Sequence, residues 1–352
     1  MKTLKLAIIG FGFVGEWHYN MICEDASQLE VVGVWDVREE ALDNAVKHGL
    51  HTYSSEQELI SDENLDLVIV ATPNNFHKDL SIACMRAGKN VICEKPVTMN
   101  ASELMEMMAV AGETGKLLTI HHQRRWDKDY LTVKKVLDDK IIGDAYFIES
   151  RVQGSRRLMH GWRSYKVNGG GMVLDWGVHL LDQVMLLTDS PVVSVGAHLL
   201  SVFTPEVEDN IKIFLRFENG ISAVLEMSTN CLINLPRWHV SCLEGTMTVD
   251  DWSAGGKIVK LKADCETAWE NDIVYTEAGP TRTMASRPAH TTEQHTLPEV
   301  AEGKSVFYDN VVDVLLNGAE PLVTPAQCLR VMQVIDLIFE ANEAGETKKC
   351  RI

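Results

Sequence analysis

The sequence predicts an α/β N-terminal Rossmann domain followed by an α+β C-terminal domain with a large, mostly antiparallel open sheet. Three observations support this fold class. Short apolar runs alternate with helical patterns over the first third of the chain, a glycine-rich turn follows the first of these runs, and strand patterns predominate beyond residue 140. The chain has 352 residues, of which 45% are hydrophobic, which suffices for two domains with cores of their own. We expect the domains to cover 1–124 and 125–352, and we allow the last helix to pack back on the first domain.

The N-terminal domain is predicted to alternate five strands with four helices. The strand patterns cover residues 4–9, 29–35, 65–71, 90–93 and 116–120. They are apolar on both faces, which suits a parallel sheet covered by helices on both sides. The helical patterns cover 12–23, 38–47, 75–87 and 101–114. Gly49, Gly88 and Gly115 each follow a helical pattern, where a left-handed residue often ends a helix.

The C-terminal domain is predicted to contain mainly strands. A helix is expected at 127–139, and strands around 144–154, 192–202, 209–217, 220–229, 236–243 and 245–250. Further helices are expected at 172–187, 298–317 and 325–344. Residues 267–297 are expected to form a long irregular excursion, which is either a functional loop or ordinary surface variation.

The charge and cysteine content exclude several classes of partner. The chain has 33 basic and 50 acidic residues, a net charge of -17, which repels phosphate backbones and anionic lipid and argues against nucleic-acid and membrane partners. Its eight cysteines form no C-x-x-C pair, which favours free thiols in a reducing compartment. No apolar stretch approaches the roughly 18 residues of a membrane helix, so we expect a cytoplasmic protein.

A dinucleotide site is predicted at the first turn. Gly10-Phe11-Gly12-Phe13-Val14-Gly15 fits the G-x-G-x-x-G pattern between a strand and a helix, where bare backbone and helix amides hold a pyrophosphate. Asp36, 21 residues past Gly15, ends the second strand and would accept hydrogen bonds from ribose hydroxyls. Asp36 would also repel a 2′-phosphate and therefore favours NAD, and the adjacent Val37 and Arg38 are further candidate cofactor contacts. Arg38 could instead pair with a 2′-phosphate, which leaves NADP as the less favoured cofactor.

Several motifs together resemble one family. The first motif is extended by His18 (GFGFVGEWH), and it is followed by ATPNNFH at 71–77, EKP at 94–96, GGGMVLDWGVH at 169–179 and EGT at 244–246, within 237–250. In this order they resemble the glucose–fructose oxidoreductase / inositol dehydrogenase / rhizopine-catabolism (Gfo/Idh/MocA) family over nearly the whole chain. The resemblance implies that the ribose and nicotinamide half of the cofactor is lined by Ala71, Thr72, Pro73, Asn75, His77, Glu94 and Lys95. It also implies a homodimer or homotetramer that forms through the C-terminal sheet.

The catalytic candidates are Lys95, Asp175 and His179. Asp175 and His179 are four residues apart on a predicted helix and would share one face. A carboxylate beside an imidazole orients it and favours its protonated form, which suits proton removal from an alcohol, although such a pair is by itself more often a surface pair. Lys95 follows a strand at the edge where α/β sheets bind ligands, and it could stabilise a developing alkoxide.

Four further residues are candidates for ligand contact. Gln123 follows the fifth strand, and Trp162 and Arg163 precede the glycine run, so these three are predicted to contact the cofactor. Arg124 is predicted to contact the substrate together with Lys95, Asp175 and His179. Packing and salt bridges are the alternative for these four. His121 and His122 would indicate a metal only with further ligands, and none stands at suitable spacing, so no metal is expected.

The predicted function is an NAD-dependent oxidoreductase that oxidises a secondary hydroxyl of a sugar, polyol or glycoside. The resemblance suggests ring carbon C2 or C3. One alternative is a redox-neutral glycosidase or isomerase that oxidises its substrate only transiently, which would release no net NADH. Another alternative is a dinucleotide-binding sensor without turnover.

Overall fold

The computed structural model describes residues 2–26, 28–265, 273–282, 287–303 and 305–352. Its N-terminal sheet has six parallel strands in the order β3-β2-β1-β4-β5-β6. These are β1 (Leu4–Ile9), β2 (Leu29–Trp35), β3 (His51–Thr52), β4 (Leu67–Val70), β5 (Asn90–Glu94) and β6 (Leu118–His121). The strand order reverses between β1 and β4, and at such a point the strand ends open a crevice for ligands.

Five helices connect these strands. They are α1 (Phe13–Asp25), α2 (Glu39–Lys47), α3 (Glu56–Ser61), α4 (His77–Arg86) and α5 (Ala101–Thr114). The predicted strands and helices are confirmed within a few residues, but the short β3 and α3 were missed. Gly49, Gly88 and Gly115 have φ angles of 76°, 84° and 64°, which confirms the left-handed helix ends predicted for them.

The C-terminal sheet has nine strands in the order β16-β13-β12-β11-β7-β10-β9-β8-β17. Only the β7–β10 pair is parallel, so the predicted open, mostly antiparallel sheet is confirmed. The strands are β7 (Ala145–Gln153), β8 (Val192–Leu200), β9 (Asn210–Phe217), β10 (Ser222–Ser228), β11 (Trp238–Cys242), β12 (Gly245–Val249), β13 (Gly256–Leu261), β16 (Thr292–His295) and β17 (Lys348–Lys349).

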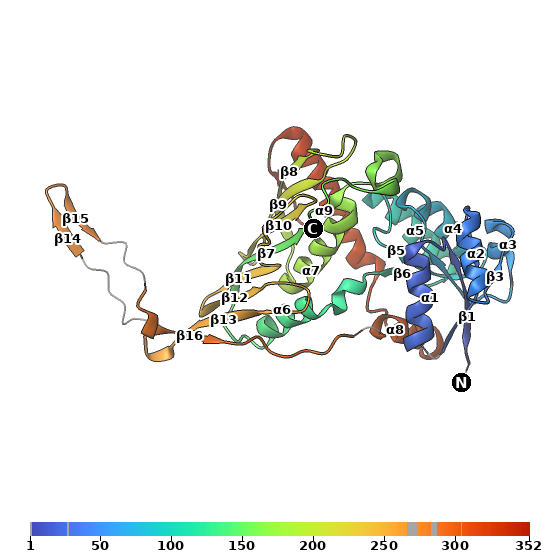
Figure 1. Cartoon of the computed structure of the whole chain (residues 1–352), viewed down its shortest axis with the longest axis horizontal. Helices are drawn as coiled ribbons and strands as arrows, with labels where there is room; N and C mark the ends of the chain where they lie inside the picture. Colours follow the sequence, from blue (N-terminus) through green and yellow to red (C-terminus); the bar gives the residue numbers. More distant parts are fainter. Residues whose placement is uncertain (1, 27, 266–272, 283–286, 304) are drawn as a thin grey trace.

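Helices cover one face of this sheet and connect it to the N-terminal domain (Figure 1). They are α6 (Lys128–Asp138), α7 (Val178–Thr188) and α9 (Pro325–Ala344). Helix α9 also packs on α5, where the Ala101 amide donates to Asp336 Oδ2 at 3.1 Å. Thr119 of β6 donates to the Val323 carbonyl at 2.9 Å. The two domains therefore share one continuous hydrophobic core.

Two predictions in the last third of the chain were wrong. Helix α8 (Val306–Asn317) begins eight residues later than 298, because Pro298 and Gly303 precede it in extended chain that runs back from β16 to the N-terminal domain.

The excursion at 267–297 is not irregular in its described part. It contains the hairpin β14 (Ile273–Thr276) and β15 (Gly279–Arg282), which projects from the body in Figure 1, and β16, which joins the large sheet through the unpredicted β13. Residues 266–272 and 283–286 of this excursion lie outside the described residues.

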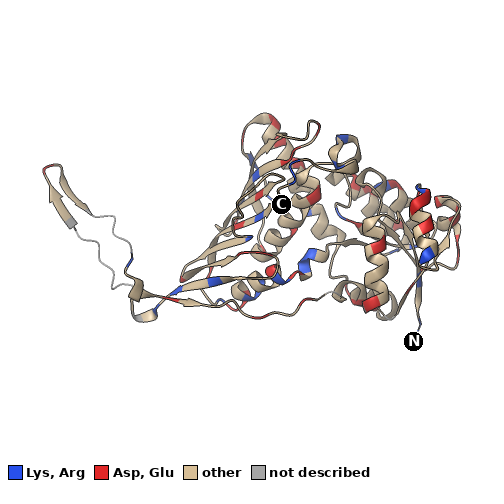
Figure 2. Cartoon of the chain, viewed as in Figure 1, with Lys and Arg blue, Asp and Glu red and all other residues tan. Residues whose placement is uncertain are grey.

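The surface reflects the acidic composition. Figure 2 marks Asp and Glu positions in red along the outer helices of the N-terminal domain. Among the described residues, no helix is both long enough and apolar enough to cross a membrane.

Candidate functional site

The turn after β1 forms a cradle of bare backbone. Gly10 has a φ of 92°, and a Cβ atom at Gly15 would lie 2.0 Å from the carbonyl oxygen of Gly10, so neither position accepts a side chain without displacement. Gly12 caps the start of α1, and the side chain of Phe13 next to it is 87% exposed. The first amides of α1 thus face an uncovered site, which is the arrangement that holds a pyrophosphate.

Asp36 and Arg38 form a tight pair beside this cradle. Asp36 Oδ2 accepts a hydrogen bond from the Phe11 amide at 2.8 Å, and Oδ1 accepts one from the Arg38 amide at 2.9 Å. The Arg38 guanidinium donates to both carboxylate oxygens, at 3.1 and 3.2 Å. Val37 between them is exposed, and so is most of the Arg38 side chain. The Asp36 carboxylate is therefore already partly neutralised by a cation.

The loop after β4 is held against the loop after β5. His77 places one ring nitrogen 2.8 Å from the Thr72 carbonyl oxygen and the other 2.8 Å from that of Pro96. Ala71 and Pro73 flank Thr72 at the same edge of the sheet as Gly10. Thr72 Oγ1 and Asn75 Oδ1 are buried without a hydrogen-bond partner. Such orphaned oxygens suit a ligand with several hydroxyl groups, as the ribose half of a dinucleotide has.

Lys95 and Asp175 meet across the domain boundary. The Lys95 ammonium lies 3.1 Å from the Asp175 carbonyl oxygen and 3.4 Å from its Oδ1, and the Arg163 Nε donates to the same Oδ1 at 3.0 Å. Burial opposes ionisation of Asp175, but the charges of Lys95 and Arg163 outweigh it and lower the pKa of this carboxyl group. The ionised Asp175 carboxylate thus forms ion pairs with both Lys95 and Arg163.

His179 lies on α7 and has a different environment from the predicted one. Its side chain is buried, and its Nδ1 has no hydrogen-bond partner. Burial lowers the pKa of His179 well below its usual value, and the charges of Lys95 and Arg124 lower it further. The expectation that Asp175 orients His179 and favours its protonated form was therefore wrong. Val173–Gly177 form a π-helical turn, so the spacing of four residues does not stack the two side chains as it would in an α-helix.

The glycine run before this turn brings Arg163 to Asp175. Trp162 and Arg163 lie in the 3₁₀ turn Gly161–Ser164, and the Arg163 guanidinium lies over the Trp162 ring at 4.4 Å. The Gly171 amide donates to the Arg163 carbonyl at 3.1 Å, and a Cβ at Gly170 would lie 2.2 Å from that same oxygen. Gly170 is therefore glycine because a second backbone segment packs directly on it, while Gly169 and Gly171 have positive φ angles of 74° and 99°.

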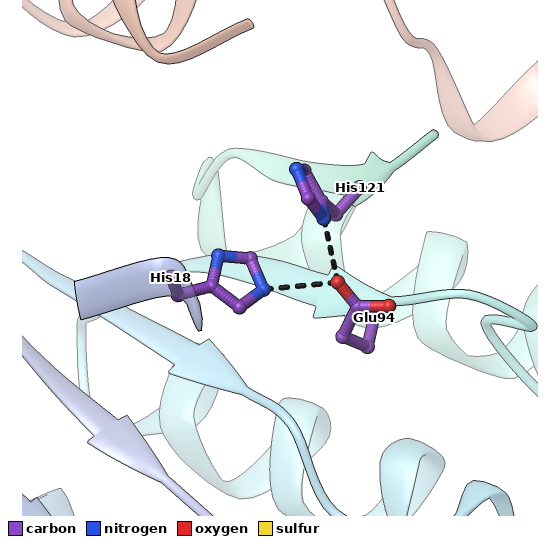
Figure 3. Close-up of side chains that lie close together, drawn as sticks. All are labelled: His18, Glu94 and His121. Atoms are coloured by element: carbon purple, nitrogen blue, oxygen red, sulfur yellow. Dashed lines mark hydrogen bonds and ion pairs between the residues drawn. The ribbon is translucent and has the colours of Figure 1, made fainter. Parts of the chain in front are cut away.

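Glu94, which precedes Lys95 in the sequence, forms a buried network with His18 and His121 (Figure 3). His18 Nε2 and His121 Nδ1 lie 2.9 and 2.6 Å from Glu94 Oε1, and the Tyr308 hydroxyl lies 2.8 Å from His18 Nδ1. The expectation that His121 has no suitable neighbours was wrong, because sequence separations of 76 and 27 residues hide the contacts with Glu94.

These distances indicate hydrogen bonds rather than a metal cage. Two ligands of a tetrahedral zinc ion stand ~3.3 Å apart, whereas both nitrogens here lie within 2.9 Å of one oxygen. Burial opposes ionisation of Glu94, but His121 and His18 outweigh it and lower the pKa of Glu94 well below its usual value. The network ties α1, β5, β6 and α8 together under the site.

Gln123 and Arg124 lie in the 3₁₀ turn Gln123–Trp126 that follows β6. The Arg124 guanidinium donates to Asp127 Oδ2 at 2.7 Å and lies 4.5 Å from the centre of the Trp176 ring and 4.6 Å from that of Trp252. Arg124 thus lies in the same region as His179. Sequence reasoning missed Trp252, which is in a turn far along the chain with no motif around it.

Comparisons with known proteins agree with this geometry. Residues 4–122 match the family model described as oxidoreductase family, NAD-binding Rossmann fold, and residues 130–248 match the GFO/IDH/MocA C-terminal domain. The crystal structure of an NAD-binding protein from Listeria innocua is 42% identical, has a TM-score of 0.93, and the match covers 99% of this chain and 100% of that one.

Two further relatives have named activities. The scyllo-inositol 2-dehydrogenase (NADP(+)) of Bacillus subtilis is 25% identical over 99% of this chain and 96% of that protein. The aldose-aldose oxidoreductase of Caulobacter crescentus, solved with glycerol, has a TM-score of 0.79 at 23% identity over 99% of this chain and 100% of that one, which shows a shared fold. With both domains matched in order along the chain, the protein belongs to the Gfo/Idh/MocA family of oxidoreductases.

Proposed function

We propose that this oxidoreductase is an NAD-dependent dehydrogenase that oxidises a secondary hydroxyl group of a sugar, polyol or glycoside, at ring carbon C2 or C3 where the substrate is a pyranose. The observation that carries the proposal is the Lys95–Asp175 ion pair beside buried His179, at the sheet edge that holds the glycine cradle. The names of the inositol dehydrogenase relatives support a polyhydroxylated substrate.

In the proposed mechanism, His179 is the general base. Burial and the nearby cations keep its imidazole neutral at pH 7, and a neutral imidazole can accept the proton of an alcohol. Because Nδ1 is enclosed, Nε2 is the nitrogen that would receive this proton. The Lys95 ammonium donates to the alcohol oxygen and stabilises the charge that develops on it.

Asp175 acts through Lys95 in this mechanism rather than through His179. Its carbonyl and carboxylate oxygens both contact the ammonium, which fixes the direction of the Lys95 side chain. Arg163 holds the other side of the same carboxylate. When bound, the nicotinamide supplies the acceptor for the hydride.

The bare cradle and Asp36 fit a nicotinamide dinucleotide, and we propose NAD as the cofactor. Asp36 is buried at the end of β2 and would accept hydrogen bonds from the ribose. Arg38 is the residue that would admit a 2′-phosphate, so NADP stays the second choice. The remaining cofactor contacts are proposed for the loops that carry Thr72, Glu94, Gln123 and Trp162.

A homodimer or homotetramer through the large sheet is also part of the proposal. The face of the sheet opposite α7 and α9 carries the exposed side chains of Phe214 and Leu200 on neighbouring strands. His198 and Lys212 lie between them on the same face, so this face mixes apolar and polar side chains, and we propose it as the surface on which a second copy of the sheet packs. Light scattering after gel filtration should give the mass of two or four chains, and a single-chain mass would contradict this part.

The test of the function is a screen for NADH and NADPH formation over monosaccharides, inositols and glycosides. Net reduced cofactor is expected with at least one compound, and His179→Ala should lower turnover at least ~100-fold while its Kd for NADH stays within ~2-fold. His51→Ala, which changes an exposed histidine on β3, is the matched control and should keep full activity. Substrate conversion without net NADH would favour the redox-neutral alternative, and near wild-type turnover of His179→Ala would reject the assignment of the base.

A further inference from the structure

A cavity of about 440 Å³ lies beside the proposed reaction site, between the two domains. Side chains from α1, the turn after β6, the π-helical turn, the turn after β12 and the start of α8 line it. Neither Lys95 nor His179 lines it. Trp176, which does, follows Asp175 in the sequence, and its ring lies 5.8 Å from that of His179. Trp176 therefore lies between the cavity and the proposed base.

The walls of the cavity combine aromatic and polar side chains. The aromatic rings are those of Trp17, Trp126, Trp176, Trp252 and Phe307. The polar lining residues are His121, Gln123, Arg124, Asp127, Lys128 and Glu302. A sugar ring carries C–H groups on its faces and hydroxyl groups on its edge, so flat aromatic walls with hydrogen-bonding groups around them match both parts. The volume falls in the range of about 300–1,000 Å³ found for small-molecule sites.

Trp252 lies in a turn and contacts three side chains. The guanidinium groups of Arg124 and Arg237 lie 4.6 and 4.5 Å from its ring centre, and Trp176 packs beside it with ring centres 5.7 Å apart. Arg237 is itself buried and lies 3.2 Å from Asp129 Oδ2. An exposed ring anchored in this way presents its free surface without losing side-chain entropy on binding.

Resting on the proposed dehydrogenase function, we propose that this cavity holds the second unit of a glycoside while Lys95 and His179 act on the first. A free monosaccharide or inositol has one ring, and that ring would have to occupy the space at Lys95 and His179 to react. It would leave the aromatic cavity unused. The substrate class is accordingly glycosides and disaccharides, with Trp252 as the residue that selects for the group attached to the oxidised sugar.

The experiment compares Trp252→Ala and Trp252→Phe with the wild type. The substrates are cellobiose, maltose and p-nitrophenyl glucosides on one side, and glucose and myo-inositol on the other. Wild-type kcat/KM is expected to be higher for the glycosides, and Trp252→Ala should raise their KM at least ~10-fold while that of the single-ring compounds stays within ~2-fold. Trp252→Phe should return the KM for the glycosides most of the way to the wild-type value. Tyr275→Ala, an exposed aromatic on β14, is the matched control.

Binding measurements separate this proposal from the function on which it rests. Saturation-transfer NMR with the same glycosides should show binding by the wild type and its loss in Trp252→Ala, whether or not the compounds are oxidised. A wild type that binds the glycosides but oxidises nothing would reject the dehydrogenase and keep the saccharide site. An equal KM rise for one-ring and two-ring compounds, no glycoside binding, or a weakened Kd for NADH in Trp252→Ala would overturn the proposal, the last because the cavity would then belong to the cofactor.

Discussion

At the scale of single residues, the charges around His179 decide whether it can act as a base. Lys95 and Arg124 are cations, and the Asp175 carboxylate contacts Lys95 and Arg163, so the charges that act most strongly on His179 oppose an imidazolium. The spacing of Asp175 and His179 in the sequence suggested the opposite. The motif residues could be predicted from the sequence, but their pairing could not, because it depends on a π-helical turn that periodicity does not reveal.

The pH dependence of kcat/KM should reflect this environment. A base is active when deprotonated, and the pKa of His179 is lowered, so the acid limb of the profile is expected below pH 6.5. Arg124→Leu removes one nearby cation and should move that limb toward higher pH. Initial rates between pH 5 and 9 provide the measurement. A wild-type limb at or above pH 6.5 would show that a different group titrates.

Arg38 should determine how well NADPH competes with NADH. It neutralises Asp36 through two hydrogen bonds, so its removal leaves an unpaired carboxylate that repels a 2′-phosphate. Arg38→Ala is expected to raise the Kd for NADPH at least ~10-fold, about the effect of one charged hydrogen bond, and that for NADH less than ~3-fold. Fluorescence titration measures both. Equal losses for the two cofactors would place Arg38 outside the ribose site.

At the scale of elements, the glycine-rich turn is the most constrained segment of the site. Gly15→Ala places a Cβ 2.0 Å from the Gly10 carbonyl oxygen, so the turn must open. NADH affinity is expected to fall at least ~10-fold, and the protein to lose on the order of 1–3 kcal/mol of stability.

Gly112→Ala is the matched control for that substitution. Gly112 lies within α5, and a Cβ atom there would meet no atom within 4 Å. Alanine at this position should keep NADH affinity and stabilise the protein by about 0.5–1 kcal/mol, since it restricts the unfolded chain. Calorimetry and thermal unfolding compare the two variants. Normal NADH binding by Gly15→Ala would mean that the turn does not hold the cofactor.

The sequence predicted elements best where local patterns decide them. The strands and long helices of the N-terminal domain follow from apolar runs and glycine caps, and α9 follows from its periodicity. The two-residue β3 is too short to show a pattern, and β16 is a polar strand, TEQH, that exists only through its pairing with β13. Tertiary contact, not local preference, sets such strands.

At the scale of the whole molecule, buried histidines should make the fold sensitive to acid. Burial lowers the pKa of His18 and His179, and that of His122 to about 4, so these side chains are neutral in the folded protein while their unfolded counterparts take up protons below about pH 6.5. The resulting loss of stability is absent well above that pH and grows as the pH falls below it, for His122 down to about pH 4. For His122 alone the loss amounts to about 3 kcal/mol.

Thermal unfolding between pH 8 and 5 tests this prediction. Tm should be flat from pH 8 to 7 and fall progressively below pH 6.5. His122→Gln lacks one of the titrating groups and should show a shallower fall. A Tm that stays constant down to pH 5 in the wild type would mean that these histidines are already protonated in the fold or accessible to water.

The site as a whole could be predicted only in part, because it is assembled across both domains. Local motifs in the sequence identified Lys95, Asp175 and His179 as candidates. The fold brings Lys95 and Asp175 together although they are 80 positions apart in the sequence. Trp252 has no motif around it, and the contacts of Glu94 with His18 and His121 have no local signal because these residues are 76 and 27 positions away in the sequence. Such contacts form only in the folded chain, so a single sequence does not reveal them.

The central claim is that the amides at the start of α1, with Asp36, hold a nicotinamide dinucleotide. Isothermal titration of the purified protein with NAD⁺, NADH, NADP⁺ and NADPH tests it most directly. The account predicts saturable binding of one molecule per chain, with NAD(H) bound more tightly than NADP(H). The absence of binding heat and of fluorescence change with all four cofactors would contradict it.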